Sequence, residues 1–103
     1  SPITDSILLS IFDIQFKSLL GTLEEKGISI ILNEEVRKKL AQKGFTAKYG
    51  ARQISSVIRN YLRRPISRFI IGGKLNEGDT LIADMDADDT IIWSIQSPGT
   101  NNG

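Results

Sequence analysis

An arginine follows a glycine and an alanine in the stretch Lys48–Gln53 (KYGARQ), directly ahead of a strong apolar repeat. A guanidinium is always charged, and its planar fork can bond two oxygens of a phosphate or carboxylate. Arg52 is therefore either part of a simple helix boundary or a residue that contacts an anionic ligand.

Most other catalytic chemistry is excluded by residue types that the chain lacks. Its 103 residues include no histidine and no cysteine, so the commonest general base, thiolate chemistry and disulfides are excluded. The only Gly-Lys pair, Gly73-Lys74, does not make a phosphate loop. Leu75 stands where that loop needs a hydroxyl, and Arg68 stands where it needs its first glycine. A pair of carboxylates remains open, but nothing in the sequence places two of the 12 acidic residues in one apolar cleft. We expect no metal site, and no nucleotide hydrolysis by this chain alone.

Alternate carboxylates in residues 84–89 (DMDADD) superficially resemble a calcium loop. An EF-hand needs glycine at loop position 6 and glutamate at position 12. Asp89 and Ile95 stand at those positions instead. The stretch is therefore predicted to be the polar tip of a hairpin.

Several arginines occur at helical spacing after residue 51. Arg52, Arg59 and Arg63 fall opposite the apolar stripe of the predicted helix, and Arg64 and Arg68 fall on another side. Such a ridge could bind nucleic acid, but the net charge is only +1 and no aromatic residues interleave with it. We expect a solvated face or a protein contact rather than a nucleic-acid partner. A stand-alone module that binds nucleic acid or protein through this ridge is the alternative function.

The sequence pattern predicts the helices and strands that position these residues. Their order indicates an α+β fold with a small sheet packed on helices. The predicted order is a helix over 5–26, a strand over 28–32, a helix over 34–43, a long helix over 51–71, and strands over 80–85 and 90–95. Asn33 is expected to cap the second helix, because its side chain can accept a bond from a free N–H group. Gly44 and Gly72 are the expected stops. Pro65 should kink the long helix, which continues because its apolar stripe does.

The first predicted helix carries two apolar stripes, and Thr4 or Asp5 can cap it. The wide stripe consists of Leu8, Leu9, Phe12, Phe16, Leu19, Leu20 and Leu23. The narrow stripe on the opposite side consists of Ile7, Ile11 and Ile14. A surface helix of a small domain needs one apolar face. The narrow stripe therefore favours a contact outside this chain, with ordinary exposed apolar surface as the alternative.

The stretch Gly44–Ile54 (GFTAKYGARQI) resembles a motif in the C-terminal small domain of the Clp-type AAA+ ATPases (the ClpB/ClpA group). The family pattern is glycine, aromatic, Asp-Pro, any residue, Tyr-Gly-Ala-Arg-Pro-Leu. The resemblance continues through Arg64–Ser67 (RPIS) and Gly72–Thr80 (GGKLNEGDT), and upstream through Glu25–Ile30 (EKGISI). Agreement in order and spacing covers roughly residues 5 to 95.

The departures from this pattern fall at five positions. Thr46-Ala47 replaces the Asp-Pro, and Gln53 replaces the proline that usually opens the helix, while Ile54 and Ser67 are mild changes. They place the chain away from the central disaggregase sequences. The type VI secretion ATPases of the ClpV kind are one divergent branch that would fit.

The resemblance implies a C-terminal lid domain of the second AAA+ module in a hexameric ATPase that unfolds or remodels proteins. In that family the arginine of Gly-Ala-Arg is sensor 2, which reaches the nucleotide phosphates at the seam with a large domain. The implied site is Gly50, Ala51 and Arg52, with Arg52 as the catalytic contribution. The resemblance also implies that ATP and Mg²⁺ are bound mainly by that large domain, and that this domain is inactive alone.

The implied partners are the large AAA+ domain of the same protein, neighbouring protomers of a homo-hexamer, and protein substrates. The chain begins with serine, which is consistent with a piece of a longer protein. No unbroken apolar run approaches about 20 residues, so we expect no membrane partner. The absence of cysteine and of a targeting signal favours a cytoplasmic location. The domain is expected to cover residues 1–96, and residues 97–103 (SPGTNNG) to form a disordered polar tail.

Overall fold

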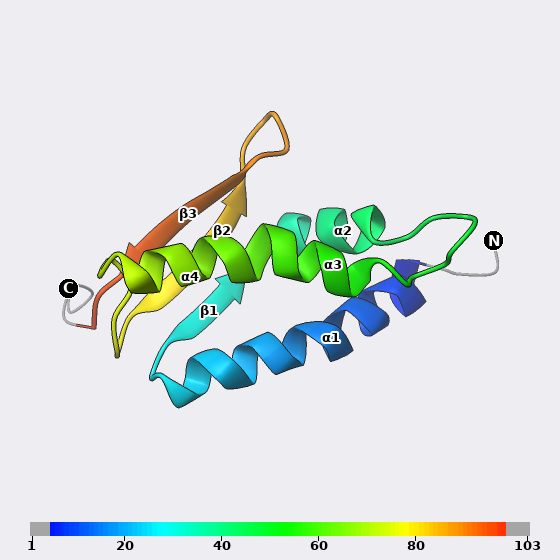
Figure 1. Cartoon of the computed structure of the whole chain (residues 1–103). Coiled ribbons are helices and arrows are strands. Elements are labelled where there is room, and N and C mark those ends of the chain that lie inside the picture. The colour runs from blue at the N-terminus through cyan, green and yellow to red at the C-terminus, as the bar shows by residue number, and fades with distance from the viewer. Residues whose placement is uncertain (1–4, 99–103) are drawn as a thin grey trace.

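Three short strands form the sheet of this domain (Figure 1), in a computed structural model that describes residues 5–98. Strand β1 (Ser29–Leu32) pairs in parallel with β2 (Thr80–Met85), and β2 pairs antiparallel with β3 (Ile91–Gln96). The predicted hairpin and the α+β class are confirmed. The parallel pairing of β1 with β2 completes the sheet in the order β1-β2-β3.

Helices cover one face of this sheet and leave the other open. Leu81 and Ala83 of β2 point to the covered face and are fully buried. Helix α4 (Arg64–Ile71) lies on this face, where the Phe69 ring meets the edge of the Trp93 ring at 5.8 Å between centroids. Residues that alternate with these, such as Ile31, stay exposed. The core therefore lies between the helices and this one face of the sheet.

Helix α1 (Asp5–Glu25) runs beside β1 (Figure 1) and buries its wide stripe as predicted. In the narrow stripe Ile7 and Ile14 are 47% and 72% exposed, whereas Ile11 is half-buried against the core. Asp5 begins the helix, while Thr4 lies outside the described residues. By length and composition alone α1 could cross a membrane, although it contains no unbroken apolar run of that length. Core helices share that property, and α1 supplies four buried side chains to the core.

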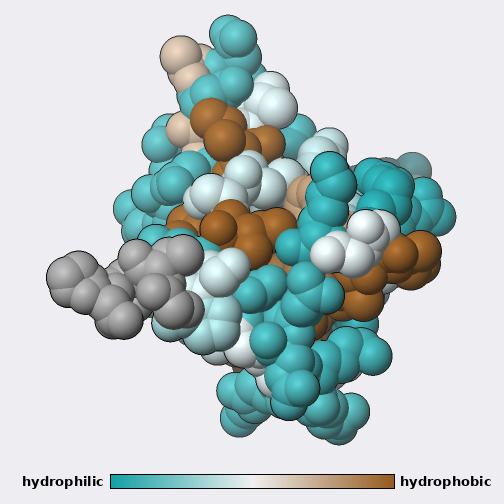
Figure 2. Space-filling model, turned by 90° about the vertical axis from the view of Figure 1, so that its left-hand side faces the viewer, coloured by the Kyte–Doolittle hydropathy of each residue, from teal (hydrophilic) through white to brown (hydrophobic). Residues whose placement is uncertain are grey.

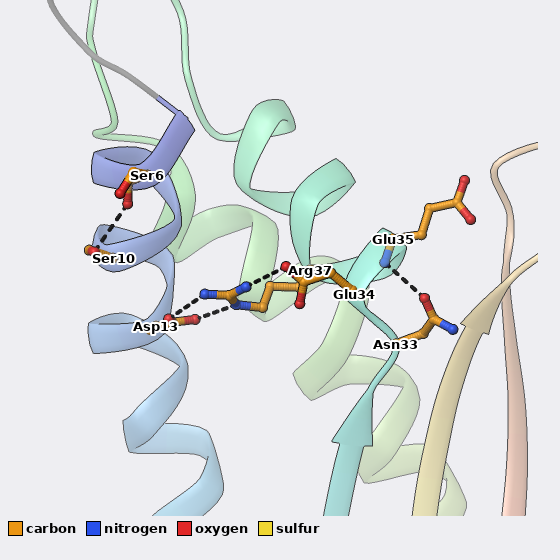
Figure 3. Close-up of polar contacts among 7 residues, drawn as sticks. All are labelled: Ser6, Ser10, Asp13, Asn33, Glu34, Glu35 and Arg37. Carbon is orange, nitrogen blue, oxygen red and sulfur yellow. Dashed lines mark hydrogen bonds and ion pairs between the residues drawn. The ribbon is translucent and has the colours of Figure 1, made fainter.

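Helix α2 (Glu34–Lys43) begins at the predicted cap. The Asn33 Oδ1 accepts the N–H of Glu35 at 2.8 Å, which satisfies one of the free donors of the first turn (Figure 3). The Asn33 amide also donates to Asp84 of β2 at 2.9 Å. One side chain thus starts α2 and fixes its direction relative to the sheet.

An ion pair ties α2 to α1. Arg37 donates to both carboxylate oxygens of Asp13, at 2.8 and 2.7 Å, and to Glu34 at 2.7 Å (Figure 3). These bonds lower the pKa of Asp13, and the same contact with Asp13 raises the pKa of Arg37. Both side chains are partly exposed, so the contribution to stability is at most about 1 kcal/mol. The pair orients the two helices more than it stabilises them.

The long helix consists of three continuous segments, α3 (Ile54–Ile58), a π-helical turn (Arg59–Arg63) and α4. The prediction that the helix continues past Pro65 is confirmed (Figure 1). The predicted start near Ala51 is wrong by three residues. Tyr61, which the 3.6-residue period places on the same apolar stripe as Ile54 and Ile58, is 40% exposed. The wider π turn shifts the stripe, because it places more residues in one turn than the 3.6 of an α-helix.

The predicted tail lies mostly outside the described residues, which end at Pro98. Within the described part, Pro98 lies next to Gly78 in the turn before β2. Figure 2 shows the side of the molecule on which this segment lies, with apolar areas separated by polar side chains.

Candidate functional site

A closed turn precedes the long helix and contains the Gly-Ala-Arg stretch. Thr46 and Gly50 exchange two backbone hydrogen bonds, at 2.9 and 2.8 Å. The Thr46 hydroxyl also accepts the N–H of Tyr49 at 3.0 Å. Aspartate and threonine side chains can both accept such a bond. Threonine in place of the family aspartate therefore still closes this turn.

Gly50 has the backbone conformation that closes the turn. Its φ is +62°, a region that residues with a side chain adopt at a cost, and no atom lies within 4 Å of where a Cβ would stand. Glycine is therefore favoured at this position by the backbone conformation of the turn, and not by close packing of another atom against its Cα. Directly after it, Ala51 is half-buried against the core, and its carbonyl accepts the N–H of Ile54.

Gly44, at the other end of the turn, allows α2 to pack directly on α3. A Cβ at this position would stand 2.7 Å from the Cα of Ile54, which real Cβ contacts do not show. Ile54 is fully buried. The lack of a side chain at Gly44 thus fixes where the long helix begins, and with it where Arg52 lies.

Gly44→Ala is expected to destabilise the domain by about 1–3 kcal/mol, because the two helices must separate to admit the methyl group. Urea unfolding followed by circular dichroism measures the change. Gly21→Ala is the matched control. It lies inside α1 with nothing within 4 Å of the new Cβ, and should be neutral or stabilising by up to about 1 kcal/mol. Equal effects of the two substitutions would contradict the packing role of Gly44.

Arg52 is exposed and lies in the turn, two residues before α3 begins. Its guanidinium lies over the Tyr49 ring at 5.0 Å from the centroid, and the Lys48 ammonium lies 5.2 Å from the same ring. Among residues 5–98, no carboxylate forms an ion pair with either cation. The turn therefore presents two cations on one aromatic ring, with their charges available to an anion.

The predicted arginine ridge does not form. Arg52 lies in the turn rather than on the helix, and Arg63 is half-buried and donates to Ser18 of α1 at 3.3 Å. Arg59 donates to Ser56 of its own helix at 3.2 Å. Arg52 therefore does not share a helical face with Arg59 and Arg63.

The other candidate stretches are turns. Residues 86–90 form the predicted polar hairpin tip, in which the Asp86 carboxylate accepts the N–H groups of Asp88 and Thr90, each at 2.9 Å. In the part of the chain that the structure describes, acidic residues form no group of three that could hold a metal ion. Gly73-Lys74 belongs to the turn that ends α4.

Comparison with known sequences tests the resemblance directly. The family model for the C-terminal D2-small domain of ClpB protein matches residues 3–83. The chain belongs to this family. The resemblance that the Gly-Ala-Arg motif indicated is thereby confirmed.

Individual relatives of this D2-small domain agree. Chaperone protein ClpB of Clostridium tetani is 31% identical over 94 residues, which is 91% of this chain. ClpB of Aquifex aeolicus is 32% identical over 83 residues, or 81% of the chain, and the chloroplastic ClpC of Pisum sativum is 30% identical over 90 residues, or 87%. The matched parts are 11%, 8% and 10% of those proteins, so the chain spans about a tenth of each.

Proposed function

We propose that this D2-small domain is the lid of the second AAA+ module in a hexameric ATPase of the Clp type. The full protein would remodel or unfold other proteins at the expense of ATP, and Arg52 would be the sensor-2 residue. The observation that carries the proposal is the exposed Arg52 guanidinium. It is held on a closed turn, and no described carboxylate neutralises it.

The donor set of the turn fits an anionic nucleotide. Arg52 would bond a phosphate oxygen, Lys48 would add a second positive charge beside it, and Gly50 and Ala51 would hold the arginine in place. ATP, when bound mainly by a large domain with its Mg²⁺, supplies the phosphoryl group. A guanidinium positioned at the phosphate stabilises its negative charge during transfer. Because the guanidinium belongs to the small domain and the nucleotide to the large one, the position of the two domains relative to each other would depend on the bound nucleotide.

The proposed partners follow from the surfaces that this chain leaves open. The large AAA+ domain of the same protein would cover Arg52 and the exposed part of the narrow isoleucine stripe, Ile7 and Ile14. Neighbouring protomers and protein substrates are partners of the whole assembly. The ClpV-type branch and the cytoplasmic location stay predictions, because relatives named ClpB and ClpC include a chloroplastic protein.

A single fluorescent label tests whether the turn lies at a nucleotide site. The chain has no cysteine of its own, so Ala47→Cys places one label on an exposed position of the Thr46–Gly50 turn and keeps both cations. In the full-length protein, with any other cysteines replaced, ATP is expected to change the emission of this label saturably. Lys74→Cys is the control, since residue 74 is exposed and lies at the opposite end of the long helix (Figure 1). No change at Ala47→Cys at saturating ATP, or an equal change at both sites, would argue against the proposed site.

A further inference from the structure

A groove lies between the π turn, the end of α2 and the hairpin, away from the Arg52 turn. We call it the Trp93 groove. Its volume is about 340 Å³, within the size range of small-ligand pockets. The apolar part is lined by Pro65, Met85, Ile91 and Trp93, and the polar part by Lys43 and Asn60. The nucleotide role of Arg52 uses none of these residues.

Lys43 gives the polar end of the groove a positive charge. Its ammonium lies over the Tyr61 ring, 5.3 Å from the centroid, and no carboxylate among residues 5–98 forms an ion pair with it. Asp89 is the acidic residue that lines the groove, and it already pairs with Lys39 at 3.3 Å. The charge that remains for a ligand is therefore positive.

The π turn supplies a second polar group. The Arg64 N–H donates to the carbonyl of Arg59, five residues back. Pro65 follows and has no N–H, so it cannot donate to the carbonyl of Asn60 in the same pattern. Asn60 lines the groove, and π turns are frequent at functional sites. Pro65 therefore cannot bond the Asn60 carbonyl, and Asn60 adds a polar residue of the π turn to the lining that also contains Lys43.

We infer that the Trp93 groove binds the C-terminal residue of a peptide chain that ends in an apolar or aromatic side chain. The side chain lies against Trp93 and Met85, the terminal carboxylate pairs with Lys43, and the last amide N–H donates to the carbonyl of Asn60. The carboxylate and the side chain of a terminal residue leave the same carbon, so one small groove can hold both.

A peptide end fits these charges better than a free amino acid does. A free amino acid carries an ammonium group on the same carbon, which Lys43 would repel. In a peptide this nitrogen is an amide that can donate a hydrogen bond. A second hollow, lined by Lys39 and Gln42, shares Lys43 and Asp89 with the groove and offers a place for the preceding residue of a peptide.

The single tryptophan of the chain is the reporter for the test. The full 103-residue chain is titrated with N-acetyl-Gly-Phe while Trp93 fluorescence is followed. Saturable binding is expected with a dissociation constant on the order of 0.1–1 mM. Such a value corresponds to the binding free energy per non-hydrogen atom that drug-sized ligands usually reach. The C-terminal amide of the same peptide and free phenylalanine should each bind about tenfold more weakly. The amide lacks the carboxylate that pairs with Lys43, and free phenylalanine carries an ammonium group that Lys43 repels.

Paired variants connect the signal to Lys43. Lys43→Met removes the charge and keeps most of the side-chain stem, and is expected to abolish the preference for the acid over the amide. Lys38→Met on the same helix removes an exposed charge outside the groove and should keep that preference. Circular dichroism confirms that both variants are folded. The inference is overturned if the acid gives no saturable signal up to about 10 mM, if acid and amide bind equally, or if Lys43→Met still discriminates between them.

Discussion

In the full-length protein, Arg52→Ala is expected to lower the ATP turnover of the module that contains this domain by about 100-fold. A single positioned donor that stabilises developing charge is typically worth about 10²–10³ in rate. The turn is held by backbone bonds between Thr46 and Gly50, so removal of the exposed Arg52 side chain should leave its fold intact. Steady-state phosphate release at saturating ATP measures the effect, with any other nucleotide site of the protein inactivated.

Two further variants separate a positioned guanidinium from charge alone. Arg52→Lys keeps the charge but loses the planar fork, and should recover only part of the turnover. Arg59→Ala removes an exposed arginine of the long helix and should leave turnover near that of the wild type. If Arg52→Ala hydrolyses ATP at the wild-type rate, the sensor assignment is wrong, whatever the family of the domain.

Phe12→Ala is expected to destabilise the domain by about 3–5 kcal/mol, which is a large part of the total stability of a domain this size. Phe12 has no exposed surface, and its ring stacks on Phe16 at 5.8 Å between centroids. Its removal leaves a cavity between α1 and the rest of the core. The midpoint of urea unfolding of the 103-residue chain measures the loss.

Ile14→Ala is the matched substitution on the same helix. Ile14 is 72% exposed in this chain, so its truncation should change the free energy of unfolding by less than about 0.5 kcal/mol. In the full-length protein the same substitution should matter more, if the large domain covers the narrow stripe. Equal losses for Phe12→Ala and Ile14→Ala in the isolated chain would mean that α1 does not pack as described.

Local signals in the sequence predicted much of this fold correctly. The Asn33 cap of α2, the β2–β3 hairpin and the continuation of the long helix past Pro65 all follow from side-chain chemistry and spacing. These features depend on residues that are close together in the sequence, so a sequence pattern can predict them.

Features that depend on distant contacts were not predicted correctly. The long helix begins three residues later than its composition indicates. The N–H groups of Arg52 and Ile54 bond to carbonyls three residues back, those of Tyr49 and Ala51, and so residues 51–53 stay in turns. Arg52 therefore lies in a turn and not on a helical ridge. Tyr61 is exposed because it lies in the π turn, which contains more residues per turn than an α-helix. A stripe predicted from a period of 3.6 residues therefore places Tyr61 on the wrong face.

The candidate site was found from a motif rather than from physical reasoning about this chain. Its residue type alone indicated only that Arg52 could bind an anion. The proposal that Arg52 is half of a nucleotide site requires a large domain that supplies the other half. The Trp93 groove had no signal in the sequence, since its lining comes from four separate segments between residues 40 and 93.

The parallel pairing of β1 with β2 has a consequence for the order of folding. Residues 29–32 pair with residues 80–83, so about fifty residues separate the two sides of this contact. Pairing over such a distance requires a large loop to close first, which slows folding. The β2–β3 hairpin can form locally, and it provides the central strand that β1 needs. During synthesis, the first three quarters of the chain therefore contain no partner strand for β1. We expect the sheet to be completed only after the last strand has left the ribosome.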